Sequence, residues 1–121
     1  MPESLLGSEA EPQPPANPAL AELHVVPPDA LVVLEGEIDL HNLHDLQQVL
    51  GVATAAAVRR LTVDLTRVEF ASLGALAALV DTARVLAARR GRVTLQGARP
   101  LHLRVIGLMD PPAALDLGPA G

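Results

Sequence analysis

The arrangement of apolar residues between positions 22 and 109 constrains the fold of this chain more than any other feature. Short apolar runs typical of β-strands alternate with longer segments in which apolar residues recur every three or four positions, as in amphipathic helices. The strand-like runs are residues 22–26, 30–38, 61–65 and 92–95. Strands that flank a helix pair in parallel through right-handed crossovers, so the order predicts an α/β fold. We expect a small sandwich of ββαβαβα order, with a mixed four-stranded sheet and three helices.

Turn and capping residues mark where these elements begin and end. Residues 27–29 read PPD, a strong turn signal that predicts an antiparallel hairpin between the first two strands. Asn42 is expected to begin the first helix, with Asp45 as its capping-box acid, and Ser72 to cap the second. Gly91 is expected to end the second helix, and Pro100 occupies a favoured first-turn position of the third.

The segments outside this pattern are expected to contribute little to the core. Residues 1–20 are rich in Pro, Glu, Ser and Ala, a composition that predicts a disordered leader. Residues 21–110 form the expected domain. Residues 111–121 are expected to be a short flexible tail, too short and too rich in Gly, Pro and Ala to add a core element.

Composition excludes several classes of function. The net charge is −5, and arginine supplies all nine basic residues, which argues against nucleic-acid binding. Phe70 is the one aromatic residue, and there is no cysteine for disulfides or thiolate metal sites. No signal sequence or apolar run of about 20 residues is present, so we expect a cytoplasmic protein without direct membrane insertion.

No residue pattern gives a strong indication of metal binding or catalysis. His41 and His44 lie three apart beside acidic residues, but a polar helix start explains them better than a metal site, which usually needs four ligands. Glycine patterns that cradle phosphates or expose a nucleophilic serine are absent. We expect no enzyme activity and no cofactor.

The carboxylates of the strands also favour structural roles. Glu35, Glu37 and Asp39 alternate along a strand, which places them on one solvent-facing side. Asp64 lies within a core strand, where we expect it to bind local backbone or an arginine, because a buried acid needs a partner.

Two stretches resemble signatures of the STAS domain family. Residues 34–40 read LEGEIDL, similar to the second-strand pattern LxGE(L/I)DL, and residues 63–70 read VDLTRVEF, similar to the third-strand pattern VDLSxVxF. Residues 75–79, ALAAL, are similar to the GLxxL that begins the next helix. The family includes bacterial anti-sigma factor antagonists, so the resemblance implies a protein-binding domain. In those proteins the anti-sigma factor is a serine kinase. The antagonist captures this kinase until the kinase phosphorylates the antagonist.

The loop after the third strand departs from the family pattern F(I/M)DS(S/T)G, in which the first serine receives phosphate. Here residues 70–75 read FASLGA. Aligned without a gap, Leu73 occupies the phosphorylated position and Ser72 that of the Asp. With one residue deleted, Ser72 becomes the phosphorylation candidate. We favour the ungapped alignment, because it keeps Leu76 and Leu79 on the apolar helix face and a one-residue shift rotates that face by about 100°.

These observations lead to two functional hypotheses. The first is a regulatory module that binds an anti-sigma factor or a serine-kinase-type regulator. It contacts this partner through a docking loop formed by Phe70, Ala71, Ser72, Leu73 and Gly74. Its phosphorylation site is then degenerate. The second is a structural STAS subunit of a larger complex, such as a bacterial lipid or anion transport system.

Overall fold

A five-stranded mixed sheet carries the structure, a computed structural model that describes residues 21–55 and 58–118. In chain order the elements are β1 (Ala21–Val26), β2 (Asp29–Ile38), α1 (Leu43–Ala55), β3 (Arg60–Ala71), α2 (Leu73–Ala87), β4 (Arg92–Gln96), α3 (Pro100–Gly107) and β5 (Leu115–Asp116). The expected leader, residues 1–20, lies outside the described residues.

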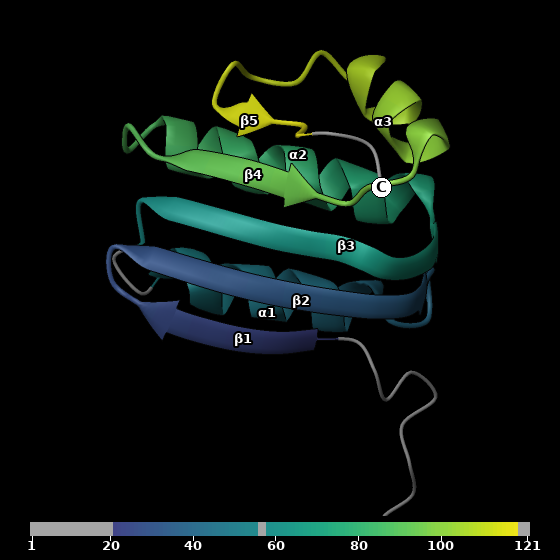
Figure 1. Ribbon diagram of the computed structural model, residues 1–121, viewed down its shortest axis with the longest axis horizontal. Coiled ribbons are helices and arrows are strands. Elements are labelled where there is room, and N and C mark those ends of the chain that lie inside the picture. Colours follow the sequence, from purple (N-terminus) through teal and green to yellow (C-terminus); the bar gives the residue numbers. More distant parts are fainter. Residues whose placement is uncertain (1–20, 56–57, 119–121) are drawn as a thin grey trace, which may run out of the picture.

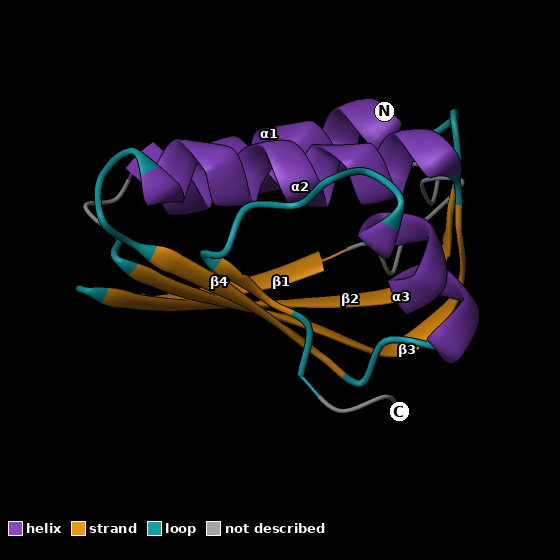
Figure 2. Cartoon of the chain, turned by 90° about the horizontal axis from the view of Figure 1, so that it is seen from above, coloured by secondary structure: helices purple, strands orange, loops and turns teal. Residues whose placement is uncertain are grey.

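The strands lie side by side in chain order, from β1 to β5 (Figure 1). Strands β1 and β2 form the predicted antiparallel hairpin, and β2, β3, β4 and β5 pair in parallel. Helices α1 and α2 cover one face of the sheet, and α3 lies beside the end at which β3 and β4 finish (Figure 2). The predicted α/β class, the mixed sheet and the three helices are confirmed.

The fifth strand was not expected. Leu115 pairs with Val93 of β4 and its side chain is buried in the core, so the C-terminal segment does add a core element. The prediction of a four-stranded sheet was wrong because two residues are too few to show any periodicity. The strand forms because β4 leaves an unpaired edge, and the backbone amide of Val93 donates to the carbonyl of Ala114 over 2.9 Å.

The core between sheet and helices is aliphatic, as the single aromatic residue requires. It is filled from the inward positions of β2 and β3 and from one face of α1 and α2, and its largest fully buried members include Leu34, Ile38, Leu46, Leu61, Leu76, Leu86 and Leu95. Burying each such side chain contributes about 1.5–3 kcal/mol.

Strand β3 is longer than the run predicted from the sequence. Its burial alternates as far as Leu65 and then changes phase, so that Val68 and Ala71 are the next buried residues. The register between β2 and β3 shifts twice, after Val33 and after Gly36. Such irregularities break the two-residue period of apolar residues, so the strand predicted from the sequence ended at residue 65. The strand itself continues into the docking loop.

Helix α2 ends at Ala87, about one turn before the predicted end at Gly91, and this glycine has a different role. Arg90 takes the left-handed conformation, with φ of 61°, and the amide of Gly91 donates to the carbonyl of Leu86 over 2.7 Å. A Cβ on Gly91 would lie 2.7 Å from the carbonyl oxygen of Arg59. Glycine is needed there because two backbones approach closely, and not because the helix cap requires it.

Candidate partner-docking site

The predicted docking loop lies at the end of the sheet where the parallel strands finish. Phe70 and Ala71 are the last two residues of β3, Ser72 connects the two elements, and Leu73 and Gly74 begin α2. The turn from β2 to α1 and the start of α3 lie at the same end (Figure 1). Ligand and partner sites of open α/β sheets commonly occupy this edge, because loops from several strands meet there.

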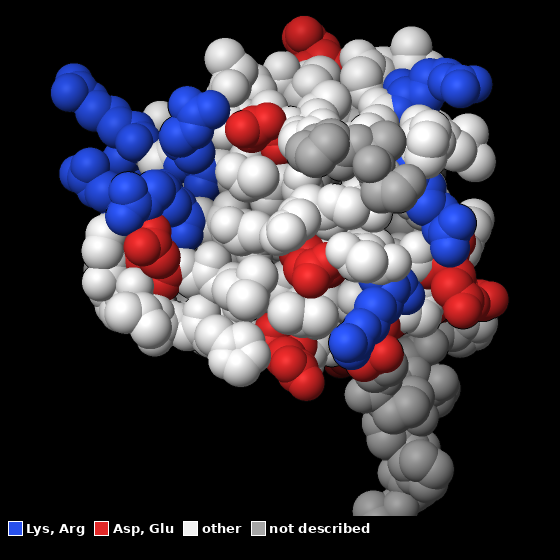
Figure 3. Space-filling model, in the orientation of Figure 1, with Lys and Arg blue, Asp and Glu red and all other residues white. Residues whose placement is uncertain are grey.

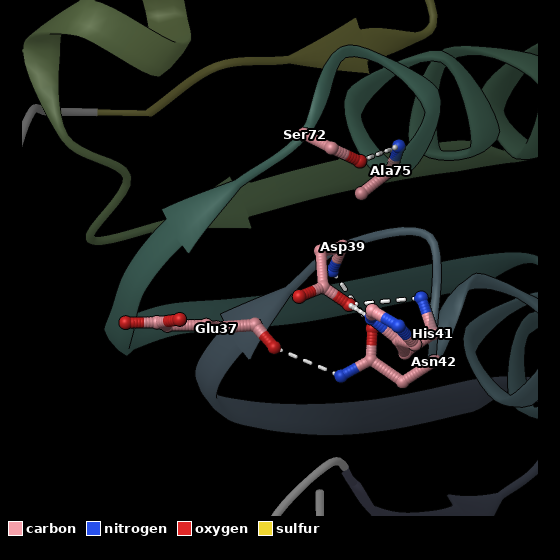
Figure 4. A network of polar contacts seen from close by, with 6 residues as sticks. All are labelled: Glu37, Asp39, His41, Asn42, Ser72 and Ala75. Carbon is pink, nitrogen blue, oxygen red and sulfur yellow. Dashed lines mark hydrogen bonds and ion pairs between the residues drawn. The ribbon is translucent and has the colours of Figure 1, made fainter.

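Ser72 is the N-cap of α2, as predicted. Its hydroxyl accepts a hydrogen bond from the backbone amide of Ala75 over 3.1 Å (Figure 4). Its own amide donates to the carbonyl of Ile38 over 2.8 Å, which ties the loop to the end of β2. The serine side chain is therefore engaged in shaping the first turn of the helix.

Two of the five predicted loop residues present large side chains to solvent. Leu73, the first residue of α2, is 67% exposed, and Phe70 is 50% exposed. Ala71 is buried instead, and Gly74 packs so closely that a Cβ there would lie 3.3 Å from a methyl carbon of Leu43. The structure thus divides the loop into an outward pair, Phe70 and Leu73, and residues that hold it in place.

Helix α3 completes this surface in a way the sequence did not indicate. Leu101, 61% exposed, lies with Phe70 and Leu73 around an apolar cavity of about 210 Å³ between β3, α2 and α3. We call Phe70, Leu73 and Leu101 the apolar docking surface. Contiguous exposed apolar residues of this kind mark sites of protein–protein contact.

His102 supports the loop from beneath. The backbone amide of Ala71 donates to its Nε2 over 3.3 Å, and its ring meets Phe70 edge to face, with centroids 6.5 Å apart. Burial lowers the pKa of His102 below its ordinary value, and the charge of Arg99 lowers it further. A neutral ring accepts the hydrogen bond. No sequence pattern connects this histidine with the loop, and its spacing of four from Ile106 is the local feature that fits an inward position.

The neighbouring β2–α1 turn is held by Asn42, a residue that is 1% exposed. Its Oδ1 accepts from the amide of Asp39 over 2.8 Å, and its Nδ2 donates to the carbonyl of Glu37 over 2.8 Å (Figure 4). Asn42 does precede the helix, and its carbonyl accepts from the amide of Leu46. Its side chain, however, bonds back to the strand, so the capping-box prediction was wrong.

The other candidate polar residues take structural positions. The Asp64 carboxylate accepts from the amide of Thr66 over 2.9 Å, which confirms its predicted role towards local backbone. His41 lies 3.5 Å from the Asp39 carboxylate on an exposed surface. Within residues 21–55 and 58–118 no three His, Asp or Glu side chains are placed to hold a metal ion. No helix among those residues is long and apolar enough to cross a membrane.

Fold and site together define a small α/β domain with an apolar surface at the carboxyl end of its parallel strands. The family model described as "Mlab, STAS domain" matches residues 26–110. The chain belongs to the STAS domain family.

Solved structures show the same fold. The unphosphorylated form of the anti-sigma factor antagonist SpoIIAA is 20% identical over 82% of this chain and 89% of that chain, with a TM-score of 0.66. The phosphorylated SpoIIAA of Bacillus is 22% identical over 78% and 87%, with a TM-score of 0.63. An anti-sigma factor antagonist from Mycobacterium paratuberculosis is 27% identical over 74% and 76%, with a TM-score of 0.62. No curated protein matches the chain in a sequence search.

Proposed function

We propose that this protein is a non-catalytic regulatory module that binds an anti-sigma factor or a serine-kinase-type regulator in the cytoplasm. The observation that carries the proposal is the apolar docking surface, because Phe70, Leu73 and Leu101 expose large apolar side chains around one cavity. The likeness to structures described as anti-sigma factor antagonists supports the class of partner.

The exposed area of Leu73 makes it the best single test of this surface. Fully burying a leucine side chain contributes about 1.5–3 kcal/mol, and Leu73 has most of its surface still to bury. A glutamate in its place would have to be dehydrated on docking. We therefore expect Leu73→Glu to weaken partner binding by roughly a hundredfold or more.

The proposed module is not switched by phosphate at its docking loop. In the ungapped alignment the acceptor position is filled by Leu73, which has no hydroxyl, and burial of Leu76 and Leu79 supports that alignment. The hydroxyl of Ser72, the remaining candidate, accepts from the amide of Ala75. A phosphate there would add nearly two negative charges and displace this cap. The module is then constitutively able to bind.

The absence of a phosphate switch is tested by incubating the protein with the serine kinase that it binds and then analysing the loop peptide by mass spectrometry. We expect no phosphate on Ser72. Phosphorylated Ser72 that also releases the partner would contradict the proposal and would support the alignment with one residue deleted.

The alternative is a structural STAS subunit of a larger complex, such as a bacterial lipid or anion transport system. The missing hydroxyl favours this alternative, since a loop with Leu73 at the acceptor position suits a permanent contact that needs no phosphate. The two functions differ in the partner, which is an anti-sigma factor in one case and an ATP-binding transport subunit in the other.

Affinity purification from the native lysate separates these functions. The wild-type chain, Leu73→Glu and the control Val52→Glu are compared, because Val52 of α1 is 57% exposed and lies outside the docking surface. An anti-sigma factor retained by the wild type and Val52→Glu but lost from Leu73→Glu would support the regulatory module. An ATP-binding transport subunit with the same pattern would support the alternative. Equal recovery with all three chains would remove this surface from the interface.

A further inference from the structure

Five of the nine arginines gather at the other end of the sheet, where the parallel strands begin (Figure 3). We call them the arginine cluster: Arg59, Arg60, Arg89, Arg90 and Arg92. Two of them, Arg60 and Arg92, are the first residues of β3 and β4, and the other three precede these strands. The stretches read RR at residues 59–60 and RRGR at residues 89–92. Since the starts of parallel strands share one edge of a sheet, residues thirty positions apart become neighbours.

The backbone of the cluster is held rigidly. Arg60 and Arg92 are direct partners in the β3–β4 register, and the amide of Arg92 donates to the carbonyl of Arg59 over 2.8 Å. The carbonyl of Pro28 accepts from the amides of Arg59 and Arg60, over 2.7 and 3.0 Å. The left-handed turn at Arg90 then directs the α2–β4 connection to the same place.

Little negative charge balances these guanidinium groups. Arg60 forms two hydrogen bonds with the Asp29 carboxylate, of 2.5 and 3.1 Å, and lowers the pKa of that carboxyl. Arg89 donates to the carbonyl of Thr54 over 2.6 Å. Among the described residues, the side chains of Arg59, Arg90 and Arg92 form no hydrogen bond or ion pair.

The charge of this end therefore opposes that of the chain. Five arginines and one aspartate give the cluster a net charge of +4, in a protein whose net charge is −5. Like charges held together repel each other, and an unbalanced group of this kind attracts anions.

The cluster also encloses a space for a ligand. Pro28, Arg59, Arg60, Arg90 and Arg92 line a cavity of about 270 Å³, the size of a small anionic group. The two oxygens of one carboxylate accept two hydrogen bonds from one guanidinium group, as those of Asp29 do from Arg60. The guanidinium groups of the other three lining arginines have more donors than a second carboxylate accepts. The oxygens of a phosphate or diphosphate, in contrast, accept hydrogen bonds from several guanidinium groups at once.

We propose that the arginine cluster is a binding site for a phosphate or diphosphate group, carried either by a soluble compound or by a phospholipid headgroup. Arg59, Arg90 and Arg92 bind the phosphate oxygens, and Arg60 stays paired with Asp29. The site lies at the opposite end of the sheet from the apolar docking surface and does not depend on it (Figure 1). The protein therefore binds a phosphate ligand and a protein partner at the same time.

Calorimetric titration of the full chain with inorganic pyrophosphate, and flotation with phosphatidylcholine vesicles that contain phosphatidylglycerol, distinguish the two sources. The test variant is Arg59→Gln/Arg92→Gln. The control, Arg67→Gln/Arg104→Gln, removes the same charge from exposed arginines outside the cluster. Hydrogen bonds to charged groups are strong enough that losing each arginine should weaken binding about tenfold or more.

Each outcome bears on the proposal. Pyrophosphate binding that is lost in the test variant and kept in the control supports a soluble ligand, and the same pattern with vesicles alone supports a headgroup. Pyrophosphate should also raise the Tm of the wild type and the control but not of the test variant, which separates loss of binding from loss of folding. Failure of the wild type to bind either probe, equal weakening in both variants, or preferential binding of polyglutamate would overturn the proposal.

Discussion

Replacing Asn42 by alanine is expected to destabilise the domain markedly, because its buried side chain closes the β2–α1 turn. The substitution removes two hydrogen bonds of 2.8 Å and leaves the amide of Asp39 and the carbonyl of Glu37 without these partners. Each such bond contributes about 1 kcal/mol, and partly buried groups left unpaired add to the loss. We expect the free energy of unfolding to fall by about 2–3 kcal/mol and the Tm by roughly 10 °C.

The measurement is urea denaturation followed by far-UV circular dichroism, since the chain has no Trp or Tyr for fluorescence. Asn42→Asp is the matched control: its carboxylate keeps an acceptor for Asp39 but cannot donate to Glu37. Asp should therefore destabilise the fold at neutral pH and recover part of the loss in acid, where the protonated carboxyl donates. An alanine variant within about 0.5 kcal/mol of the wild type would refute the reasoning.

Four further substitutions test the packing of the domain. Burial holds the pKa of His102 below its ordinary value, so the unfolded chain binds the proton more readily and stability is lost as pH falls below about 6.5. His102→Gln should lose this dependence, and an unchanged pH profile in denaturation would contradict it. Gly97→Ala, at φ of 74° and with the Thr66 hydroxyl against the added Cβ, should cost about 1–2 kcal/mol, whereas Gly51→Ala within α1 should stabilise by about 0.5–1 kcal/mol. A stabilised Gly97→Ala or a destabilised Gly51→Ala in chemical denaturation would disprove this. Leu115→Ala should cost about 2–4 kcal/mol, and a thermal melt that matches the wild type would remove β5 from the core.

The docking loop shows which features of the site could be predicted from residues close together in the sequence. The cap at Ser72 was predictable because it depends on atoms three residues apart. The exposure of Leu73 was not, because the helix period places it on the same face as the buried Leu76 and Val80. Leu101 and His102 were not placed at this site, because they reach it from α3, some thirty residues further along the chain. The sequence therefore indicated Phe70 and Leu73 but not Leu101, the third residue of the apolar docking surface.

Asn42 illustrates the opposite case, a residue whose position was predicted and whose bonds were not. The sequence shows a good capping residue before a helix, and the same amide can bond forward to the helix or back to the strand. The turn from β2 brings the carbonyl of Glu37 within 2.8 Å, which decides for the strand. Such a choice depends on three-dimensional geometry that spacing does not encode.

By itself, the sequence determined the order of the first four strands and the three helices, the hairpin and the cap at Ser72, because periodicity and turn chemistry act over a few residues. Only the tertiary structure decided the fifth strand, the histidine beneath the docking surface and the arginine cluster. In each case the partners are far apart in the chain. The parallel register of the sheet joins them at the fifth strand and at the arginine cluster, and the packing of α3 brings His102 to the end of β3.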